Sequence, residues 1–176
     1  MSTLKFPVSS DDHMQGAEDV PCTLVEYGDY ECPHCRAAHP VIKQVEKHFG
    51  KQLCFVFRNF PLTQIHENAQ AAAETAEFAG SEGKFWEMHD LLFENQERLG
   101  EDLYDELAAQ LGLDTAKLRA SLEGGSFTGR VRNDFTGGVR SGVNGTPTFF
   151  VNGQRHNGPA DFEHLVKAIE AALMNQ

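Results

Sequence analysis

Two cysteines separated by two residues, Cys32 and Cys35, carry the clearest chemical potential in this sequence. An apolar run at 22–27 and a polar turn at 28–31 precede them, and a helical pattern follows as far as Phe49. We therefore expect Cys32 where a strand ends and a helix begins. A helix N-terminus presents unpaired N–H groups and a partial positive charge, both of which favour a thiolate. The pattern predicts that Cys32 attacks as the nucleophile and that Cys35, one helical turn later, resolves the mixed disulfide.

The two residues between the cysteines contribute to this prediction. Pro33 fits the first helical position, where its missing N–H has no cost. The helix dipole contributes about 0.3–1 kcal/mol at exposed sites, and up to ~2 kcal/mol in favourable geometry. Since one pKa unit corresponds to about 1.36 kcal/mol, the dipole lowers a thiol pKa by roughly one unit or a little more. A larger depression needs N–H hydrogen bonds to the sulfur and a contribution from His34.

Two metal-binding interpretations compete with the redox one. A Cys-x-x-Cys pair can be half of a structural zinc site, but such a site needs four ligands, and the sequence has no second pair or spaced His pair. His34 and His39 lie on the same short stretch, which cannot easily supply all corners of a tetrahedron. A c-type haem site needs His after the second cysteine, where Arg36 stands instead. We expect neither a metal nor a cofactor.

Composition limits the class of protein. The chain has 176 residues, 40% of them hydrophobic and 23% charged, which indicates a folded core rather than disorder. A formal net charge of −11 argues against nucleic acid or an anionic membrane as a partner. No apolar stretch reaches the ~18–20 residues of a membrane span, and residues 1–20 lack the apolar core of a secretory signal. We expect a cytoplasmic protein, or a periplasmic one if a signal has been removed.

The order of apolar segments predicts the architecture. Residues 1–20 form a polar N-terminal segment with at most a short edge strand near 4–8 and no catalytic role. Apolar strands at 22–27 and 53–57, joined by the helix that ends at Gly50, predict a right-handed βαβ unit with parallel strands. Cys22 and Cys54 are expected to be buried small side chains, with a disulfide between them the lesser alternative. Glu26 interrupts its strand and is either solvent-facing or a buried acid.

Helical patterns fill the next eighty residues or so. Small residues from Ala69 to Ala79 predict close helix packing, and apolar residues every four positions from Phe127 to Val143 predict an amphipathic helix. Strand signals return at 148–151, with a hairpin at Asn152-Gly153 and a closing helix at 160–174. We assign 21–62 and 143–176 to one α/β domain with a mixed sheet, and 63–142 to an all-helical insertion. For the Thr146-Pro147 bond, base rates alone favour trans.

This order of elements is similar to the thioredoxin fold, and the helical insertion resembles that of the DsbA-like thiol–disulfide oxidoreductases. The residues themselves match as well, and the resemblance covers nearly all of residues 21–170. Four segments carry the resemblance: LVEYGDYECPHC at 24–35, FRNFPL at 57–62, FWEMHD at 85–90 and GTPTF at 145–149.

The resemblance implies roles that spacing does not show. Pro147 would be a cis-proline facing the cysteine pair, and Thr146 would offer backbone hydrogen bonds to an extended substrate peptide. Pro33 would border the same substrate-binding surface. Glu26 would be a buried acid beneath the thiols, and His34 would tune Cys32.

We therefore expect an enzyme that exchanges disulfides with protein or peptide substrates through Cys32 and Cys35. The direction, oxidase or reductase and isomerase, stays open, as do its redox partner, its substrate and its oligomeric state. Thr146 stands directly before Pro147, where isomerases and reductases of this family also have threonine, whereas some strongly oxidising members have valine. The alternative is a non-redox peptide-binding or chaperone-like module on the same fold. A glutathione-dependent isomerase is disfavoured because both cysteines are present.

Overall fold

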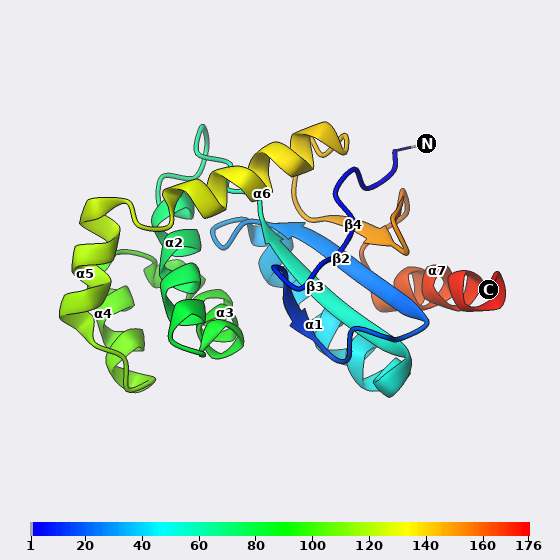
Figure 1. Cartoon of the computed structure of the whole chain (residues 1–176), viewed down its shortest axis with the longest axis horizontal. Helices are drawn as coiled ribbons and strands as arrows, with labels where there is room; N and C mark the ends of the chain where they lie inside the picture. Colours follow the sequence, from blue (N-terminus) through cyan, green and yellow to red (C-terminus); the bar gives the residue numbers. More distant parts are fainter. Residues whose placement is uncertain (1) are drawn as a thin grey trace.

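The computed structural model describes residues 2–176, which form one mixed five-stranded sheet with helices on both faces (Figure 1). The strand order is β1-β3-β2-β4-β5. Strands β2 and β3 are parallel, and the other neighbouring pairs are antiparallel. The strands are β1 (His13–Gln15), β2 (Cys22–Gly28), β3 (Leu53–Asn59), β4 (Thr148–Val151) and β5 (Gln154–Arg155). The predicted mixed sheet of a thioredoxin-like fold is confirmed.

The central strands are buried because both faces of the sheet are covered. Helix α1 (Pro33–Phe49) follows β2 and leads through the short helix η1 (Gly50–Gln52) into β3. It packs with α7 (Phe162–Met174) on one face. The other face is covered by the N-terminal segment and by Phe135 of α6 (Thr128–Arg140). Near-continuous apolar strands are what a sheet covered on both faces requires.

An all-helical insertion separates β3 from β4, as predicted, although the limits 63 and 142 stay a prediction. Figure 1 shows its helices beside the sheet, with α6 running back across it. The alanines of the first inserted helix are buried except for the half-buried Ala71, which lets the neighbouring helices approach closely. The insertion contains α2 (Ala69–Ser81), α3 (Phe85–Glu94), η2 (Gln96–Arg98), α4 (Glu101–Gln110), α5 (Thr115–Gly124) and α6.

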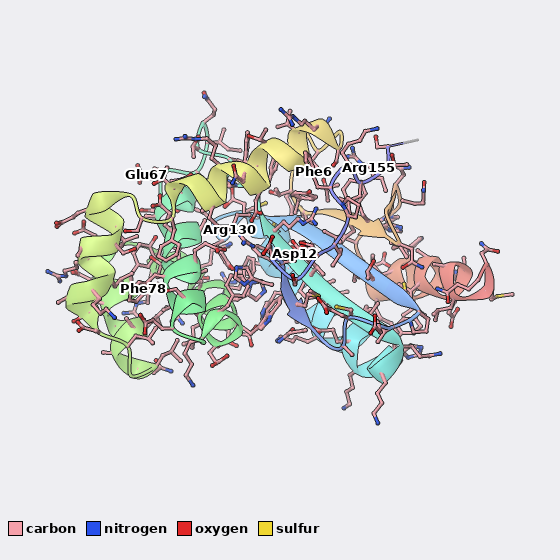
Figure 2. The ribbon with its side chains drawn as sticks, in the orientation of Figure 1. Phe6, Asp12, Glu67, Phe78, Arg130 and Arg155 are labelled. Carbon is pink, nitrogen blue, oxygen red and sulfur yellow. The ribbon has the colours of Figure 1, made fainter. Side chains whose placement is uncertain are left out.

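The prediction of a short edge strand near 4–8 is wrong. The N-terminal strand instead lies at 13–15, antiparallel to β3. Pro7 has no N–H for a strand ladder, and the carbonyls of Phe6 and Pro7 accept hydrogen bonds from the Arg58 guanidinium at 2.9 and 3.3 Å. Figure 2 shows Phe6 and Asp12 on this segment, close to α6. A side chain therefore replaces a strand partner here.

The expected single apolar face from Phe127 to Val143 is also wrong in part. Val131 is buried at 1% exposure, but Val139 is 52% exposed. A step of four residues advances ~40° beyond a full turn, since a helix has about 3.6 residues per turn, so a strict four-residue repeat drifts around the helix. Phe162, the first residue of α7, is also exposed, at 36%.

Cys22 and Cys54 are free and buried. The register pairs Cys22 with Leu53 and Thr23 with Cys54. The two thiols therefore occupy successive positions along the paired strands, and they belong to core clusters on opposite faces of the sheet. This placement explains why the lesser alternative, a disulfide, does not form. No helix within residues 2–176 has the length and apolarity needed to cross a bilayer.

Candidate functional site

The cysteine pair lies at the start of α1, where the sequence predicts it. Cys32 is the N-cap residue in an extended conformation (φ −73°, ψ 122°), and Pro33 occupies the first helical turn. The Cys32 side chain is mostly covered and that of Cys35 is fully buried. A short turn from β2 fixes this entry, since Cys32 N donates to the Asp29 carbonyl at 3.1 Å. The nucleophile is thus held at the positive end of a helix.

The loop before β4 faces this pair. The Thr146-Pro147 bond is cis, which confirms what the resemblance implies and overturns the base-rate expectation of trans. The Cys32 thiol lies 3.5 Å from the Thr146 carbonyl oxygen, to which it can donate as a neutral group. The Thr146 hydroxyl is buried beside the Cys32 sulfur and has no other partner within residues 2–176.

The two thiols have opposite proton affinities. Hydrogen bonding from the Cys35 side chain, then from Thr146, and from the N–H groups of Cys35 and His34, lowers the pKa of Cys32 to about 5. Burial, followed by the hydrogen bond to Cys32 and the charge of Glu26, raises the pKa of Cys35 well above its ordinary value. Near neutral pH, Cys32 is therefore a thiolate and Cys35 a thiol. The depression exceeds the roughly one unit expected of the helix dipole, because direct hydrogen bonds reach the sulfur.

Glu26 lies beneath the pair in the central strand. Its register partners are Phe57 on β3 and Phe149 on β4, and only 2% of it is exposed. The interpretation of Glu26 as a solvent-facing residue is wrong, because neither face of β2 is open. Burial, together with the nearby Cys32 thiolate, raises the pKa of Glu26 to about 8, and its Oε1 has no partner within residues 2–176. This carboxyl can hold a proton at neutral pH.

The remaining predicted site residues lie at the rim. Pro33 and His34 are both exposed. Within residues 2–176 the His34 imidazole makes no hydrogen bond or ion pair, and this residue acts on Cys32 through its backbone N–H. A cavity of about 220 Å³ borders Pro147, with Thr148, Phe149 and His156 among its lining residues. It is large enough for one peptide side chain.

Sequence reasoning missed Asp29. Its fully buried carboxylate accepts hydrogen bonds from Glu31 N at 2.8 Å, Leu62 N at 2.9 Å and His66 Nδ1 at 2.8 Å. Asp29 thereby ties the turn before Cys32 to the loop after β3. The Gly28-Asp29 pair indicated a turn, but nothing in the sequence indicated the partners, which are 33 and 37 residues away.

Gln96 was missed as well. Its side-chain Nε2 donates to the carbonyls of Tyr30 at 2.8 Å and Cys32 at 2.9 Å. The residue belongs to η2, so the helical insertion reaches the backbone of the nucleophile itself. No motif in the sequence marks this glutamine.

One group of potential metal ligands occurs within residues 2–176. The ligand atoms of His39, His89 and Asp90 all lie within 4.8 Å of one another. Hydrogen bonds already engage each of them, since His39 and Lys43 contact Asp90 at 2.8 and 3.0 Å and Tyr30 contacts His89 at 2.9 Å. The Lys43 ammonium would also repel a cation. We therefore interpret this group as part of the contact between α1 and α3.

A separate cavity of about 620 Å³ lies between α6 and the N-terminal segment. Its lining includes neither cysteine, nor Glu26, nor Pro147. This cavity is therefore separate from the site around the cysteine pair.

Comparison with solved structures gives matches over more than nine-tenths of the chain. BdbD from Bacillus subtilis in its oxidised form is 26% identical, with a TM-score of 0.88 and 98% of each chain covered. A thioredoxin-like oxidoreductase from Silicibacter pomeroyi DSS-3 is also 26% identical, with a TM-score of 0.82 and 93% of each chain covered. The alpha-DsbA1 of Wolbachia pipientis, 19% identical with a TM-score of 0.83 over 98% of this chain and 95% of that one, shares the fold.

The curated relatives are longer proteins. Na(+)/H(+) antiporter NhaA 1 of Salinispora arenicola (strain CNS-205) is 44% identical over 171 residues, which are 97% of this chain and 26% of the relative. The NhaA 1 of Mycobacterium sp. (strain KMS) is 43% identical over 173 residues, 96% of this chain and 28% of the relative. The chain thus spans about a quarter of the length of these relatives.

A family model described as Thioredoxin matches residues 9–171, which include the cysteine pair, Glu26 and the cis-proline. The chain belongs to this thioredoxin family, and its structural neighbours are the DsbA-like thiol–disulfide oxidoreductases.

Proposed function

We propose that this protein is an enzyme that exchanges disulfides with protein or peptide thiols through Cys32 and Cys35. The observation that carries the proposal is the Cys32 sulfur, whose pKa is lowered to about 5 by surrounding hydrogen-bond donors and which lies 3.5 Å from the cis-proline loop. A stabilised thiolate at a helix N-terminus is the reactive species in such exchange.

The proposed cycle moves two electrons from substrate to enzyme. A substrate thiolate attacks the Cys32 sulfur of the Cys32–Cys35 disulfide, forms a mixed disulfide with Cys32 and expels Cys35 as a thiolate. A second substrate thiolate then attacks the substrate sulfur of the mixed disulfide. It releases Cys32 as a thiolate and leaves a substrate disulfide. The stabilised Cys32 thiolate makes the second step fast, because a thiol of lower pKa leaves more readily.

Glu26 supplies the proton that Cys35 needs when it is expelled. The raised pKa of Glu26, about 8, keeps the carboxyl largely protonated near neutral pH, and when it does ionise, its charge raises the pKa of Cys35. In the reverse, reducing direction the same carboxyl accepts the Cys35 proton, so that Cys35 can attack the mixed disulfide. Glu26 therefore serves both directions as the buried acid and base.

We propose that the oxidising direction is favoured. A Cys32 pKa of about 5 stabilises the reduced enzyme at pH 7 relative to a pair with ordinary thiols. Each tenfold stabilisation of the reduced form raises the potential by about 30 mV, so two pKa units below neutral pH raise it by up to about 60 mV. An oxidant of this kind fits the periplasmic alternative better than the cytoplasmic one, and fractionation of cells with an antibody to the chain tests the compartment.

The test is the equilibrium of the purified protein with a glutathione redox buffer, with the fraction of Cys32–Cys35 disulfide counted by alkylation and mass. We expect a reversible disulfide with a potential well above the −270 mV typical of thioredoxin. A potential at or below that value would refute the oxidising direction. A pair that forms no reversible disulfide would refute the whole proposal.

The same preparation tests the non-redox alternative. Replacing both cysteines, Cys32→Ser with Cys35→Ser, should abolish thiol oxidation of a reduced substrate peptide. If the double variant still protected an unfolding protein from aggregation as well as the wild type does, the peptide-binding function would be the one supported.

The curated relatives favour one candidate partner. Their names describe Na(+)/H(+) antiporters, and this chain matches about a quarter of their length. We propose that the substrate thiols include those of an antiporter of this kind. Trapping with Cys35→Ser, which leaves the mixed disulfide on Cys32 unresolved, should capture such a membrane protein, and the Cys32→Ser variant is the matched control that should capture none.

A further inference from the structure

Across residues 2–176, the side chain of Gln96 makes the only hydrogen bond from the helical insertion to the backbone of Cys32. Its Nε2 bridges the carbonyls of Tyr30 and Cys32, at 2.8 and 2.9 Å. Within residues 2–176, the Tyr30 carbonyl accepts no other hydrogen bond, whereas the Cys32 carbonyl also accepts from Arg36 N at 3.1 Å. Gln96 therefore holds both ends of residues 30–32, the three-residue entry into α1, by hydrogen bonds.

This entry determines which groups face the sulfur. Cys32 is extended rather than helical, and it is in this conformation that the N–H groups of His34 and Cys35 reach its sulfur. The Cys32 carbonyl accepts the first hydrogen bond of the helix. A second donor on that carbonyl fixes the tilt of the peptide unit that joins Cys32 to Pro33, and the side chain of Cys32 moves with it.

We propose that Gln96 is a positioning residue for Cys32, through which the helical insertion sets the reactivity of the attacking thiol. The inference deepens the proposed function, because it assigns control of the Cys32 sulfur to an element outside the α/β domain. Replacing Gln96 by methionine keeps the length and volume of the side chain but removes both donors, and the Tyr30 carbonyl then loses its partner.

Other contacts hold the insertion against α1 without reaching this entry, and they provide matched controls. Glu97, the next residue, pairs with Arg36 at the surface. Asp90 on α3 accepts hydrogen bonds from His39 at 2.8 Å and Lys43 at 3.1 Å, farther along α1. Glu97→Gln and Asp90→Asn therefore weaken the same interface while leaving the carbonyls of Tyr30 and Cys32 engaged.

The experiment follows the Cys32 thiolate of the reduced protein by its ultraviolet absorbance and its iodoacetamide alkylation between pH 3 and 9. For Gln96→Met we expect the midpoint to rise by about one pH unit, so that alkylation at pH 5 slows roughly fivefold. The melting temperature is recorded for every variant, since a merely structural contact would lower it without moving the midpoint. Glu97→Gln and Asp90→Asn should keep the wild-type midpoint.

A Gln96→Met profile that overlays the wild type would overturn the inference. So would an equal shift in Glu97→Gln or Asp90→Asn, because the effect would then belong to the whole interface. The wild-type protein is equilibrated with glutathione in parallel. If it forms a reversible disulfide while the variant's midpoint is unchanged, only the inference about Gln96 fails; if it forms none, the proposed function itself fails.

Discussion

At the scale of single residues, three ionisable groups share one small volume beneath the surface. Cys32 loses its proton at an unusually low pH, whereas Cys35 and Glu26 keep theirs to an unusually high pH. The depressed pKa of Cys32 and the raised pKa of Glu26 have opposite effects on stability. The site thus stabilises the Cys32 thiolate and at the same time disfavours ionisation of the buried Glu26 carboxyl.

The first prediction concerns Glu26. In the unfolded chain this carboxyl ionises near its ordinary pKa of 4.5, but in the folded protein it keeps its proton until about pH 8. Between these values the folded state binds more protons, so the contribution of Glu26 to the free energy of unfolding falls as pH rises. Glu26→Gln mimics the protonated acid. We expect this variant to match the wild type near pH 4 and to exceed it by up to about 3 kcal/mol at pH 7.

Urea unfolding of the two reduced proteins at pH 4, 5.5 and 7 measures this difference. Since Cys32 titrates in both proteins, its own pH dependence largely cancels in the comparison. A constant difference across this range would show that Glu26 ionises normally in the folded state. Catalysis in the reducing direction should be impaired instead, since Glu26→Gln cannot take the Cys35 proton, and the attack of Cys35 on the mixed disulfide should slow.

The sequence indicates the two cysteines better than the residues that hold them in place through hydrogen bonds. The spacing of Cys32 and Cys35 is local, so it is visible in the sequence. Glu26 stayed ambiguous, because its burial depends on elements that cover both faces of its strand. Asp29 and Gln96 escaped notice because their partners lie 33 to 66 residues away, a separation at which no local pattern records a hydrogen bond.

At the scale of the elements, helix α6 shows how packing depends on the absence of a side chain. At Gly138 a Cβ would lie 2.7 Å from Phe60 Cδ2 and 3.0 Å from Tyr27 Cδ1, and both rings are buried. Phe60 also stacks on Phe135 of the same helix, at 4.3 Å between ring centroids. The close approach of α6 to the sheet therefore requires glycine at 138.

We expect Gly138→Ala to destabilise the protein by about 1–3 kcal/mol, the usual cost of overpacking a core. The matched control is Gly129→Ala in the same helix, where a Cβ would meet nothing within 4 Å. That substitution should stabilise by about 0.5 kcal/mol, since alanine loses less conformational entropy in a helix. Chemical denaturation of both variants measures the change in the free energy of unfolding, which should be negative for Gly138→Ala and positive for Gly129→Ala. Equal effects would show that helix propensity, and not the contact with Phe60, decides at 138.

A helix cap gives a second prediction at this scale. The Asp114 side chain accepts hydrogen bonds from the N–H groups of Ala116 and Lys117, at 2.9 and 3.2 Å, and so caps α5. Asp114→Ala should lower the free energy of unfolding by about 1 kcal/mol. Asp114→Asn, which retains the accepting oxygen, should recover most of it, and denaturation curves of the two variants make the comparison. No recovery would assign the effect to charge rather than to capping.

The elements whose patterns are local were predicted well, and those defined by distant partners were not. Strands β2 and β3 and helix α1 follow from uninterrupted apolar runs and regular spacing. The N-terminal strand was misplaced because the hydrogen-bond partner of residues 6 and 7 is the side chain of Arg58, 51 or more residues away. The drift of a four-residue repeat explains the exposed Val139.

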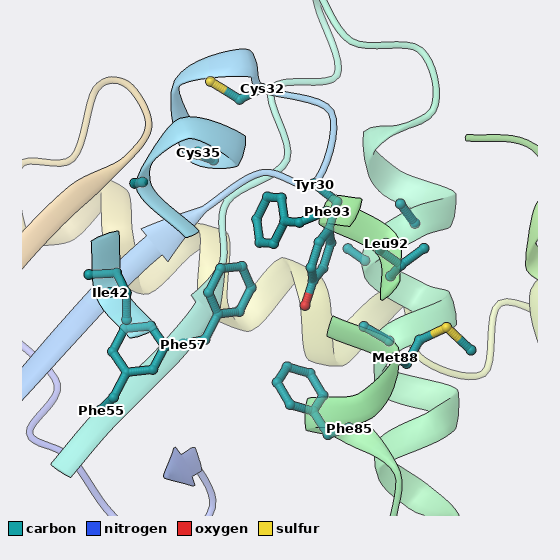
Figure 3. Close-up of a cluster of buried hydrophobic side chains, with 14 of the residues drawn as sticks. Tyr30, Cys32, Cys35, Ile42, Phe55, Phe57, Phe85, Met88, Leu92 and Phe93 are labelled. Atoms are coloured by element: carbon teal, nitrogen blue, oxygen red, sulfur yellow. The ribbon is translucent and has the colours of Figure 1, made fainter. Parts of the chain in front are cut away.

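At the scale of the whole molecule, one aromatic cluster joins the insertion to the sheet. Figure 3 shows Tyr30, Phe57 and Phe93 together below the cysteine helix. The ring centroid of Tyr30 lies 4.9 Å from that of Phe93 on α3 and 5.2 Å from that of Phe57 on β3. The Tyr30 hydroxyl also bonds to buried His89 of α3 at 2.9 Å. The sequence predicts an insertion of helices, but this docking depends on surfaces that no periodicity describes.

Because this cluster couples the two parts, we expect the wild-type protein to unfold in a single transition. Trp86, the only tryptophan, lies on α3 where the insertion meets the sheet, since its Nε1 donates to the Met14 carbonyl at 2.9 Å and its ring centroid lies 5.7 Å from that of Phe55. Its fluorescence therefore reports on this contact, whereas far-UV circular dichroism reports on the whole chain. Phe93→Ala removes the ring that contacts both Tyr30 and Phe57 and should cost about 3–5 kcal/mol. Its fluorescence transition should then come at lower urea than its circular dichroism transition.

The control for this coupling is Leu118→Ala on α5, a helix that packs against α2 and α4 within the insertion. Leu118 is fully buried, so its truncation should cost about 2–5 kcal/mol. The loss falls inside the insertion and leaves the aromatic cluster intact, so the two transitions should shift together. Coincident transitions in Phe93→Ala would mean that other contacts couple the parts, such as those of Asp90 and Gln96 with α1 and its entry. Separated transitions in Phe93→Ala alone would place the coupling directly beneath the reactive cysteines, where docking of the insertion and positioning of Cys32 depend on the same contacts.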